Sequence, residues 1–322
     1  MEKLVVSKVN DVFLRIESEG GARQELADYF TFYVPGYKFM PAFKNKMWDG
    51  KIRLYDLRTL TLYAGLFGYL KKFAEERGYE IEVNFSDPIT KVNEEDVKSY
   101  VEKHLRLPFS PYDYQYQAVT HALRNKRCLL LSPTASGKSF IQYLILRKIQ
   151  DSDFKKGLLI VPTTSLVEQM YSDFKSYGYD SDKYCHRQYA GKDKFSDKFL
   201  TITTWQSIYK NPPEYFEQFD FVLGDEAHQF KAKSLTTILS GCVNAKYRIG
   251  TTGTLDGTQT HKLVLEGLFG PVYRATSTSD LIEKGQLASF KIKCLILKYT
   301  ENVCKEARSW DYNQELEYIV MN

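Results

Sequence analysis

The chain has 322 residues, of which 43% are hydrophobic and 26% are charged, a balance typical of a folded globular protein rather than a disordered one. Its net charge of +4 is too small to indicate a nucleic acid partner by itself. No apolar run approaches the ~20 residues of a membrane-spanning helix, and the N-terminus lacks the apolar segment of a signal peptide. The five cysteines are scattered and include no C-x-x-C pair, so we expect no zinc site, no disulfide framework and a cytoplasmic location.

The first part of the chain predicts a small α+β domain over residues 1–88, a candidate for DNA binding. Alternating apolar residues predict a strand or hairpin over residues 4–18, and a short helix is expected within residues 20–34. A strand at 51–56, an amphipathic helix at 66–79 and a closing strand at 80–85 complete the pattern.

A basic and aromatic segment lies within this domain. Between Gly36 and Arg58 there are six basic residues against two acidic ones, with five aromatic residues interleaved. Cations beside aromatic side chains suit a nucleic acid surface, although a charge run is more commonly only a solvated face. The candidate phosphate contacts are Lys44, Lys46, Lys51 and Arg53, whereas Trp48-Asp49-Gly50 is expected to form a structural turn.

A polar linker at 89–110, with a helix beginning near Asn93, leads to a different pattern over residues 111–298. Short apolar β-rich runs there alternate with longer helical ones. Continuous apolar strands separated by helices predict a parallel sheet with helices on both faces. In such folds ligands bind at the carboxyl ends of the strands, which is where the polar motifs of this chain fall.

The stretch LLLSPTASGKSF ends in Gly137-Lys138-Ser139, as a phosphate-binding loop does, but Ser132 stands where the pattern G-x-x-x-x-G-K-[ST] has its first glycine. An apolar strand runs into this loop and a helix follows, so backbone N–H groups could point at phosphate oxygens. Lys138 would then reach the β- and γ-phosphates, and the hydroxyl of Ser139 would bind Mg²⁺. The loop alone is equally compatible with a plain strand-to-helix turn.

A second motif, FDFVLGDEAH, places Asp225 and Glu226 directly after an apolar strand. A carboxylate at a strand end can hold Mg²⁺, and its neighbour can orient the attacking water. The alternative is an acid-rich start of a helix, which is common in proteins. The combination of the tetrapeptide DEAH with Lys138 upstream favours a nucleotide site.

These motifs, taken in order, resemble the first motor domain of superfamily 2 helicases. Tyr114-Gln115 resembles the adenine-recognising motif, residues 132–139 motif I, Val161-Pro162-Thr163-Thr164 with Gln169 motif Ia, Thr203-Thr204-Trp205-Gln206 motifs Ib and Ic, DEAH motif II, and Thr252-Gly253-Thr254 motif III. The resemblance spans roughly residues 107–297 and implies a RecA-like sheet of the P-loop NTPase class. One departure is Ala135, where these helicases usually place a glycine.

The resemblance implies a role for each matching residue, with ATP and Mg²⁺ as cofactors. Asp225 and Ser139 would hold the metal, Glu226 would position water, Lys138 would bind phosphate and His228 would link the γ-phosphate region to motif III. Gln115 would read adenine, with Gln117 as its rival. The nucleotide-binding residues are Gln115, Pro133, Thr134, Ala135, Ser136, Gly137, Lys138 and Ser139; the coupling residues are Thr252, Gly253 and Thr254; the DNA-binding residues are Pro162, Thr163, Thr164, Thr204, Trp205 and Gln206. Taken singly, His228 could be a helix cap, residues 252–254 a tight turn, and Trp205 a core residue.

The N-terminal segment YKFMPAFKNKMWDGKIRLYD, followed by LFGYLKKFAEERGY, is similar to the N-terminal domain of UvsW-type phage recombination helicases. This resemblance implies a DNA-dependent ATPase that remodels branched or single-stranded DNA without reading sequence, in a phage-infected bacterial cell. Residues 299–322 resemble the approach to a second RecA-like domain, which we expect to act in cis or in trans. Two alternatives remain: a motor subunit of a restriction or defence complex, and a DNA-binding module with an inactive nucleotide pocket.

Overall fold

The N-terminal domain is an antiparallel sheet, closed by one parallel strand and covered by two helices. The computed structural model describes residues 2–86, 90–190, 195–230, 232–255, 259–288, 293–294 and 296–321. The strand order is β5 (Tyr55–Asp56), β6 (Thr61–Tyr63), β2 (Phe13–Glu17), β1 (Lys3–Lys8) and β7 (Glu80–Val83), with β1 and β7 parallel. Alternate residues of β1 and β2 are buried because a strand directs successive side chains to opposite faces. The buried face packs against α1 (Gly20–Tyr29) and α3 (Phe67–Arg77).

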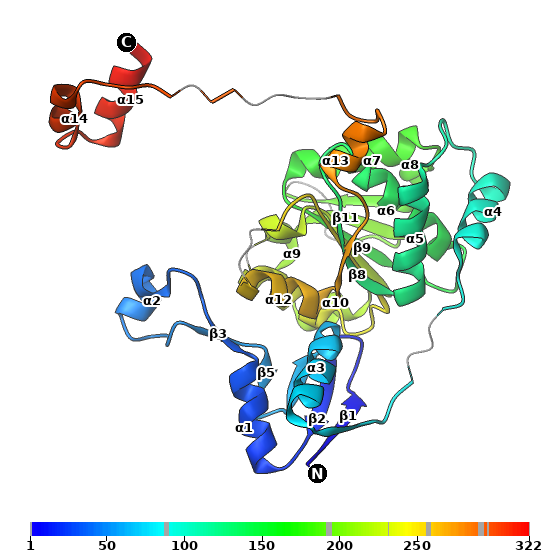
Figure 1. The fold of residues 1–322 in the computed structure, drawn as a ribbon. Coiled ribbons are helices and arrows are strands. Elements are labelled where there is room, and N and C mark those ends of the chain that lie inside the picture. The colour runs from blue at the N-terminus through cyan, green and yellow to red at the C-terminus, as the bar shows by residue number, and fades with distance from the viewer. Residues whose placement is uncertain are drawn as a thin grey trace.

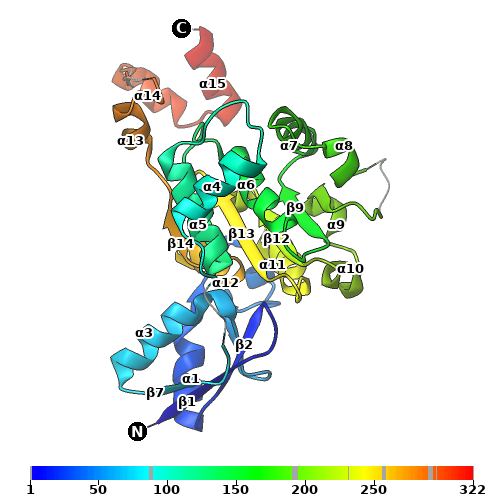
Figure 2. The same ribbon diagram turned by 90° about the vertical axis from the view of Figure 1, so that its right-hand side faces the viewer.

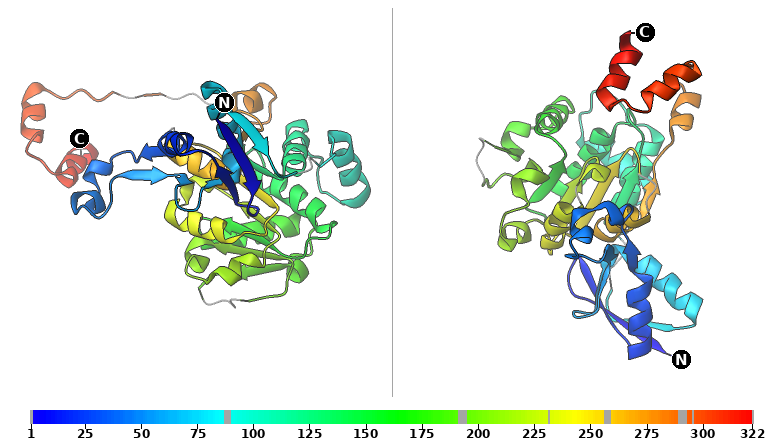
Figure 3. Two further views of the ribbon diagram at one scale, coloured as in Figure 1. Left: turned by 90° about the horizontal axis from the view of Figure 1, so that it is seen from below. Right: turned by 90° about the vertical axis from the view of Figure 1, so that its left-hand side faces the viewer.

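A smaller substructure, residues 31–53, extends from this domain, and we call it the arm. Strand β3 (Thr31–Tyr33) pairs antiparallel with β4 (Lys51–Arg53), and the connection forms the short helices η1 (Tyr37–Phe39) and α2 (Pro41–Lys44). In Figure 1 α2 projects from the N-terminal domain on the side where α9 (Trp205–Ile208) also lies, and Figure 3 shows the same projection from below.

The segment between the two domains forms the helix α4 (Glu94–His104), which begins after Asn93 as the sequence predicts. Asn93 and Asp96 form a reciprocal capping box, which satisfies two backbone N–H groups at the start of the helix. Its apolar face, with Val97, Tyr100 and Val101, joins the core formed with α5 (Asp113–Asn125). The helix therefore packs into the second domain.

The second domain is built on a seven-stranded parallel sheet within the described residues, which confirms the predicted α/β fold. Its strand order is β10 (Cys185–Gln188), β11 (Leu200–Thr204), β9 (Gly157–Val161), β12 (Phe221–Gly224), β13 (Tyr247–Thr252), β8 (Arg127–Leu131) and β14 (Val272–Arg274). The central strands β9 and β12 are buried along their whole length because helices cover both faces. One face packs against α5, α6 (Lys138–Gln150) and α7 (Thr164–Ser176). The other face packs against α10 (Pro213–Glu217), α11 (Ala232–Gly241) and α12 (Gln259–Leu268), and Figure 2 shows the sheet between these layers.

The two domains share one continuous apolar core and meet closely at η2 (Ala64–Leu66) and α12. A Cβ atom built on Gly65 would lie 1.9 Å from the carbonyl oxygen of Glu266, so only glycine fits at this contact. The hydroxyl of Tyr69 donates to Oε2 of Glu266 at 2.7 Å, and the backbone N–H of Asp11 donates to the carbonyl oxygen of Val243 at 3.1 Å. These contacts fix the N-terminal domain against the helices beneath the sheet.

The remaining elements include α8 (Ser181–Tyr184), η3 (Ala227–Gln229) and α13 (Thr278–Glu283). The helices α14 (Glu301–Ala307) and α15 (Tyr312–Met321) stand apart from both domains in Figure 1. Among the described residues, no helix combines the length and apolar character needed to cross a membrane. The domain boundaries given above from the sequence stay a prediction.

Candidate nucleotide site and nucleic acid interface

The order of strands in the sheet brings the sequence motifs to one edge. Strands β9, β12, β13 and β8 are direct neighbours and run parallel, so their carboxyl ends meet there. The loops that follow them carry motif Ia, the DEAH sequence, motif III and the phosphate loop respectively. A doubly covered parallel sheet binds ligands at this edge because the loops and helix N-termini converge on it.

The loop after β8 folds on its own hydrogen bonds. Ser132 is buried, its backbone N–H donates to the carbonyl oxygen of Thr252 at 2.9 Å, and its hydroxyl donates to that of Ser136 at 2.6 Å. Ser136 in turn donates to the carbonyl oxygen of Pro133 at 2.7 Å. The backbone N–H of Ser132 therefore ties the loop to motif III, and its hydroxyl adds a hydrogen bond within the loop that a glycine at this position could not make.

Two residues of this loop have positive φ angles. Gly137 has φ 76°, and a Cβ built there would lie 2.6 Å from the side-chain nitrogen of Gln115. Ala135 has φ 65°, a conformation that costs a residue with a Cβ roughly 1–2 kcal/mol. The departure from glycine noted in the sequence therefore falls at a left-handed backbone position.

The catalytic candidates converge around Lys138. Its Nζ lies 3.1 Å from Oε1 of Glu226, and a Cβ built on Gly253 would lie 3.5 Å from the same nitrogen. The backbone of Glu226 is left-handed, with φ 47°, so the chain turns there and the Glu226 carboxylate points away from the line of strand β12. The structure thus places the phosphate loop, the DEAH acid and motif III around one cation.

Asp225 is nearly buried and is held by two polar side chains. The hydroxyl of Thr251 donates to Oδ1 of Asp225 at 2.6 Å, and Nε2 of Gln142 donates to that same oxygen at 3.2 Å. Gln142 also donates to the hydroxyl of Thr251 at 2.6 Å, which closes the triangle. Burial raises the pKa of the Asp225 carboxyl, an effect that the hydrogen bond from Thr251 opposes. A cation bound at this carboxylate would favour its ionised form.

The motif III link implied by the family resemblance is present in the geometry. Nδ1 of His228 lies 2.7 Å from the hydroxyl oxygen of Thr252, and that hydroxyl donates to the carbonyl oxygen of Thr254 at 2.7 Å. Because the hydroxyl proton is used there, Nδ1 of His228 is assigned as the donor to Thr252. His228 also lies 3.4 Å from Oε2 of Glu226, so it connects motif III to the acidic side of the site.

A cleft of about 410 Å³ opens beside these residues and includes side chains that the sequence did not single out. Helix α7 contributes Met170 and Asp173, and the hydroxyl of Ser139 lies 3.0 Å from that of Tyr177, also in the α7 region. Burial raises the pKa of the Asp173 carboxyl, which a hydrogen bond with Ser139 opposes. From the sequence, only the position of α7 directly after motif Ia could have indicated that this helix lines the cleft. Asp173 and Tyr177 alone form no distinctive pattern.

Gln115 lies against the phosphate loop. Its Nε2 donates to the carbonyl oxygen of Ser136 at 3.0 Å, and its Oε1 accepts from the backbone N–H of Tyr112 at 2.9 Å. The hydroxyl of Tyr114 donates to the same Ser136 oxygen at 2.8 Å. In this structure these side chains position the loop, whereas Gln117 is exposed. Adenine recognition by Gln115 stays a prediction.

The predicted DNA-binding residues of the second domain lie on two loops that contact each other, and they differ in exposure. Nε2 of Gln206 donates to the carbonyl oxygen of Pro162 at 3.3 Å, so the loops after β9 and β11 are joined. Thr163 caps α7 and is exposed with Thr164, whereas Thr204 is buried and bonds to Ser207. Trp205 is partly buried against the core, which fits the alternative that it is a core residue.

The basic candidates of the N-terminal domain all lie on the arm. Lys44 and Lys46 are exposed, and Lys51 stands over the ring of Tyr33 with its Nζ 5.0 Å from the centroid. Arg53 forms an ion pair with Asp49, which lowers the pKa of that carboxyl, so Arg53 carries less uncompensated charge than the lysines. The indole nitrogen of Trp48 donates to the carbonyl oxygen of Lys51 at 2.9 Å and closes the turn.

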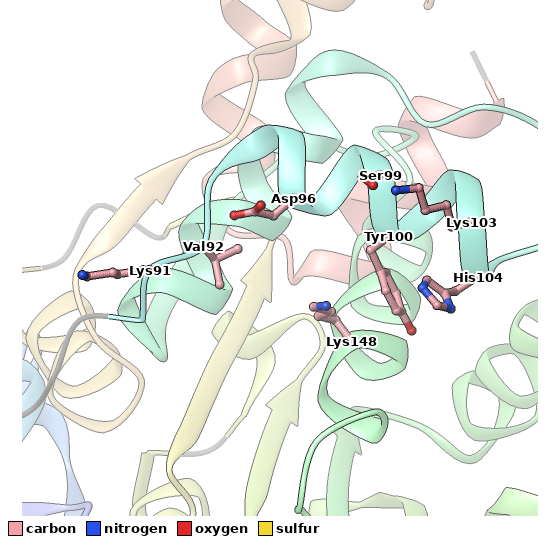
Figure 4. A pocket seen from close by; sticks show the side chains of 8 residues that line it. All are labelled: Lys91, Val92, Asp96, Ser99, Tyr100, Lys103, His104 and Lys148. Atoms are coloured by element: carbon pink, nitrogen blue, oxygen red, sulfur yellow. The ribbon is translucent and has the colours of Figure 1, made fainter.

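A second hollow lies beside α4 and is separate from the nucleotide cleft. Figure 4 shows Lys103 and His104 of α4 with Lys148 of α6 around Tyr100, and Lys148 Nζ lies 4.3 Å from the ring centroid. Lys148 belongs to the last turn of α6, whereas the phosphate loop precedes its first turn. Helix α6 has 13 residues and rises roughly 1.5 Å per residue, so most of the length of this helix separates the hollow from the phosphate loop.

Comparison with known proteins agrees with this geometry over nearly the whole chain. The family model described as "DNA helicase UvsW, N-terminal" matches residues 7–84, and the one described as "Type III restriction enzyme, res subunit" matches residues 108–257. A crystal structure of the UvsW helicase from bacteriophage T4 superimposes with a TM-score of 0.78 at 33% identity, covering 84% of this chain and 99% of that chain. The chain belongs to the UvsW family of superfamily 2 helicases.

Curated relatives of this UvsW-family chain are longer than it is. The ATP-dependent DNA helicase uvsW of Enterobacteria phage T4 is 33% identical over 316 residues, which are 95% of this chain and 62% of the relative. The DNA 3'-5' translocase XPB2 of Sulfurisphaera tokodaii is 26% identical over 274 residues, 84% of this chain and 55% of the relative. The chain thus spans somewhat more than half the length of these relatives.

The donor set fits a hard cation held together with nucleotide phosphates. A hydroxyl (Ser139) and a carboxylate (Asp225) are the oxygen ligands that Mg²⁺ takes from P-loop proteins, while phosphates and waters complete its shell. No group of three or more His, Cys, Asp or Glu side chains arranged for a metal occurs among the described residues. The site therefore suits magnesium bound with a nucleotide and not a dedicated protein cage.

Proposed function

We propose that this chain is the ATP-binding part of a DNA motor that couples ATP hydrolysis to the remodelling of branched DNA in recombination, repair and replication. The observation that carries the proposal is the convergence of Lys138, Glu226, Asp225 and Ser139 at one cleft, in a chain of the UvsW family. The same edge of the sheet continues into the loops that carry Pro162 and Gln206. The T4 relative, named as a helicase, supports action on DNA in a phage-infected cell.

Each residue acts through its own chemistry. Lys138, paired with Glu226 here, would exchange this partner for the phosphates, which frees the carboxylate to orient water. Asp225 and Ser139 would hold Mg²⁺, which neutralises charge developing on the phosphates. His228 and Thr252 would report the state of Glu226 to motif III through their hydrogen bond. Residues Thr163 and Thr164, exposed at the start of α7, would contact the DNA backbone without reading bases.

We further propose that full activity needs a second RecA-like domain, supplied in cis or in trans, which contributes an arginine finger. In related NTPases such a finger accounts for roughly 10³–10⁵ in rate. Among the described residues, Arg274 and Arg308 do not line the nucleotide cleft. The chain alone is therefore expected to bind ATP and DNA weakly, to hydrolyse ATP slowly and not to unwind.

The test measures DNA-stimulated ATP hydrolysis by this chain and by Glu226→Gln. We expect slow hydrolysis that Glu226→Gln lowers by at least about tenfold, because the water loses its orienting carboxylate. Hydrolysis of equal rate in both proteins would contradict the assignment of Glu226. Robust DNA-stimulated turnover by the chain alone would contradict the need for a second domain.

One alternative is favoured by a specific observation. The match of residues 108–257 to a restriction-enzyme family fits a motor subunit of a restriction or defence complex equally well. The match of residues 7–84 to the UvsW N-terminal family favours the recombination motor. A nuclease that copurifies with the chain from its source would favour the restriction complex.

A further inference from the structure

The tip of the arm exposes large apolar side chains. The side chain of Phe39 is 80% exposed and that of Met47 is 78% exposed, and Met40 is also exposed. Scattered exposed apolar residues are common, but three of them within nine residues of one projecting element are not expected without a ligand. Figure 1 shows that this part of the arm extends beyond the body of the N-terminal domain.

Aromatic side chains pack against one another within the arm and hold its two strands and the connection between them together. The rings of Tyr33 and Tyr37 stack at 4.8 Å, and Phe43 packs edge-on against Tyr37, also at 4.8 Å. Gly50 has φ 80°, and a Cβ built there would lie 2.3 Å from the Tyr37 ring, so the glycine lets the returning strand close over that ring. A preorganised element loses little conformational entropy when it binds.

Cations surround the apolar tip. Within residues 31–53 there are five basic residues and one acidic residue, and the acid is already paired with Arg53. Lys38, Lys44 and Lys46, which flank the apolar side chains along the chain, are exposed. A protein partner with an apolar pocket would not need this charge, whereas nucleic acid offers apolar base faces framed by phosphates.

We propose that the arm is a wedge for branched DNA, with Phe39 and Met47 in contact with the bases at the branch point while Lys38, Lys44 and Lys46 hold the flanking phosphates. This inference rests on the proposed DNA-motor function and adds the part of the substrate that the N-terminal domain recognises. At a branch, the last base pair of a duplex segment has one face on which no other base pair stacks. An apolar side chain can cover this face without first breaking a stack. A continuous duplex has such faces only at its two ends, so the apolar tip gives a preference for branches and the lysines give affinity for both.

The experiment measures binding of the full chain to a forked DNA and to a continuous duplex of equal length by fluorescence anisotropy. The double variant Phe39→Ala with Met47→Ala is expected to lose on the order of five- to tenfold in fork affinity and to keep its duplex affinity within about twofold. A 2-aminopurine at the branch should report loss of base contact in the same variant. The matched control is Phe195→Ala, which removes a ring 75% exposed on the second domain and should change neither affinity.

Charge variants separate the two roles of the arm. Lys44→Glu with Lys46→Glu should weaken fork and duplex binding alike and reduce the salt dependence of both. Lys103→Glu, a lysine of α4 outside the arm, should leave both nearly unchanged. Unchanged fork preference in the apolar double variant, or concentration-dependent dimerisation of the wild-type chain that this variant abolishes, would overturn the wedge. Neither result would touch the nucleotide site, which Glu226→Gln tests separately.

Discussion

At the scale of single residues, the nucleotide site depends on buried polar side chains that hydrogen-bond to one another. Asp225 is nearly buried, and without the hydroxyl of Thr251 and the amide of Gln142 its carboxylate would have few partners. A buried polar group left without a partner costs about 1–3 kcal/mol. Thr251 and Gln142 lie outside the sequence motifs that led to the site, so the sequence predicted the carboxylate and not its support.

The first prediction concerns Thr251→Val, which keeps the shape of the side chain and removes the hydroxyl that holds Asp225. We expect the affinity for Mg²⁺-nucleotide to fall by on the order of five- to tenfold, about 1–1.4 kcal/mol, because the carboxylate loses its orientation. Equilibrium binding of a fluorescent ATP analogue with Mg²⁺ measures the effect.

The matched control for this change is Thr203→Val. Thr203 is also buried, but its hydroxyl donates to the carbonyl oxygen of Gln188 at 2.7 Å, away from the nucleotide cleft. Both variants lose a buried hydrogen bond, so both should lower stability. Equal nucleotide affinity in the two variants would show that Thr251 acts on stability alone.

Other residue roles were predicted only as far as the motif register allowed. Lys138, Glu226, His228 and Thr252 come together as the family resemblance implied, because they lie at the carboxyl ends of the adjacent strands β12, β13 and β8 or begin the helix that follows. Gln115 instead shows hydrogen bonds to the phosphate loop and to Tyr112. Motif register gives the location of a side chain, whereas its partners depend on packing that one sequence does not specify.

At the scale of elements, periodicity predicted the buried strands well and the polar or mixed ones poorly. The runs that became β8, β9 and β12 are mainly apolar because both faces of the sheet are covered. Strands β11 and β13 are also buried, but they include threonines and Arg248. Strand β10, with the sequence Cys-His-Arg-Gln, lies at the edge of the sheet and has no such signal. The short helix expected within residues 20–34 is α1, but the sequence did not predict that the last residues of this segment form β3, which pairs with a strand 20 residues further on.

The contact between η2 and α12 is a feature of whole elements that the sequence does not predict, because a glycine such as Gly65 in an apolar segment has many explanations. Gly65→Ala would place a methyl group 1.9 Å from the Glu266 carbonyl oxygen and force the N-terminal domain away from α12. Overpacking of this kind costs typically 1–3 kcal/mol, so we expect a melting temperature lower by roughly 2–12 °C. Thermal unfolding followed by circular dichroism measures it.

Gly68→Ala is the control for this prediction. Nothing lies within 4 Å of a Cβ built on Gly68, which belongs to the first turn of α3, and alanine there favours the helix by about 0.5–1 kcal/mol. The two variants differ only in the neighbour that the new methyl group meets. A Gly65→Ala protein as stable as the Gly68→Ala protein would contradict the tight domain contact.

At the scale of the whole molecule, two domains joined through a shared core present the nucleotide cleft, the loops of motifs Ia and Ib, and the arm. The shared core and the Tyr69–Glu266 hydrogen bond join the N-terminal domain, which carries the arm, to the domain of the seven-stranded sheet. Sequence reasoning predicted both domains, but it could not predict how they dock, since the docking depends on shape at η2 and α12.

The central claim, that residues 132–139 and the DEAH sequence form a working Mg²⁺-nucleotide site, is tested most directly by isothermal titration of this chain with a non-hydrolysable ATP analogue. We predict saturable binding that EDTA weakens and that Lys138→Ala lowers by at least about tenfold, because the cation that faces the phosphates is removed. Equal heats from the wild-type chain and Lys138→Ala in the presence of Mg²⁺, or no binding to either, would contradict it.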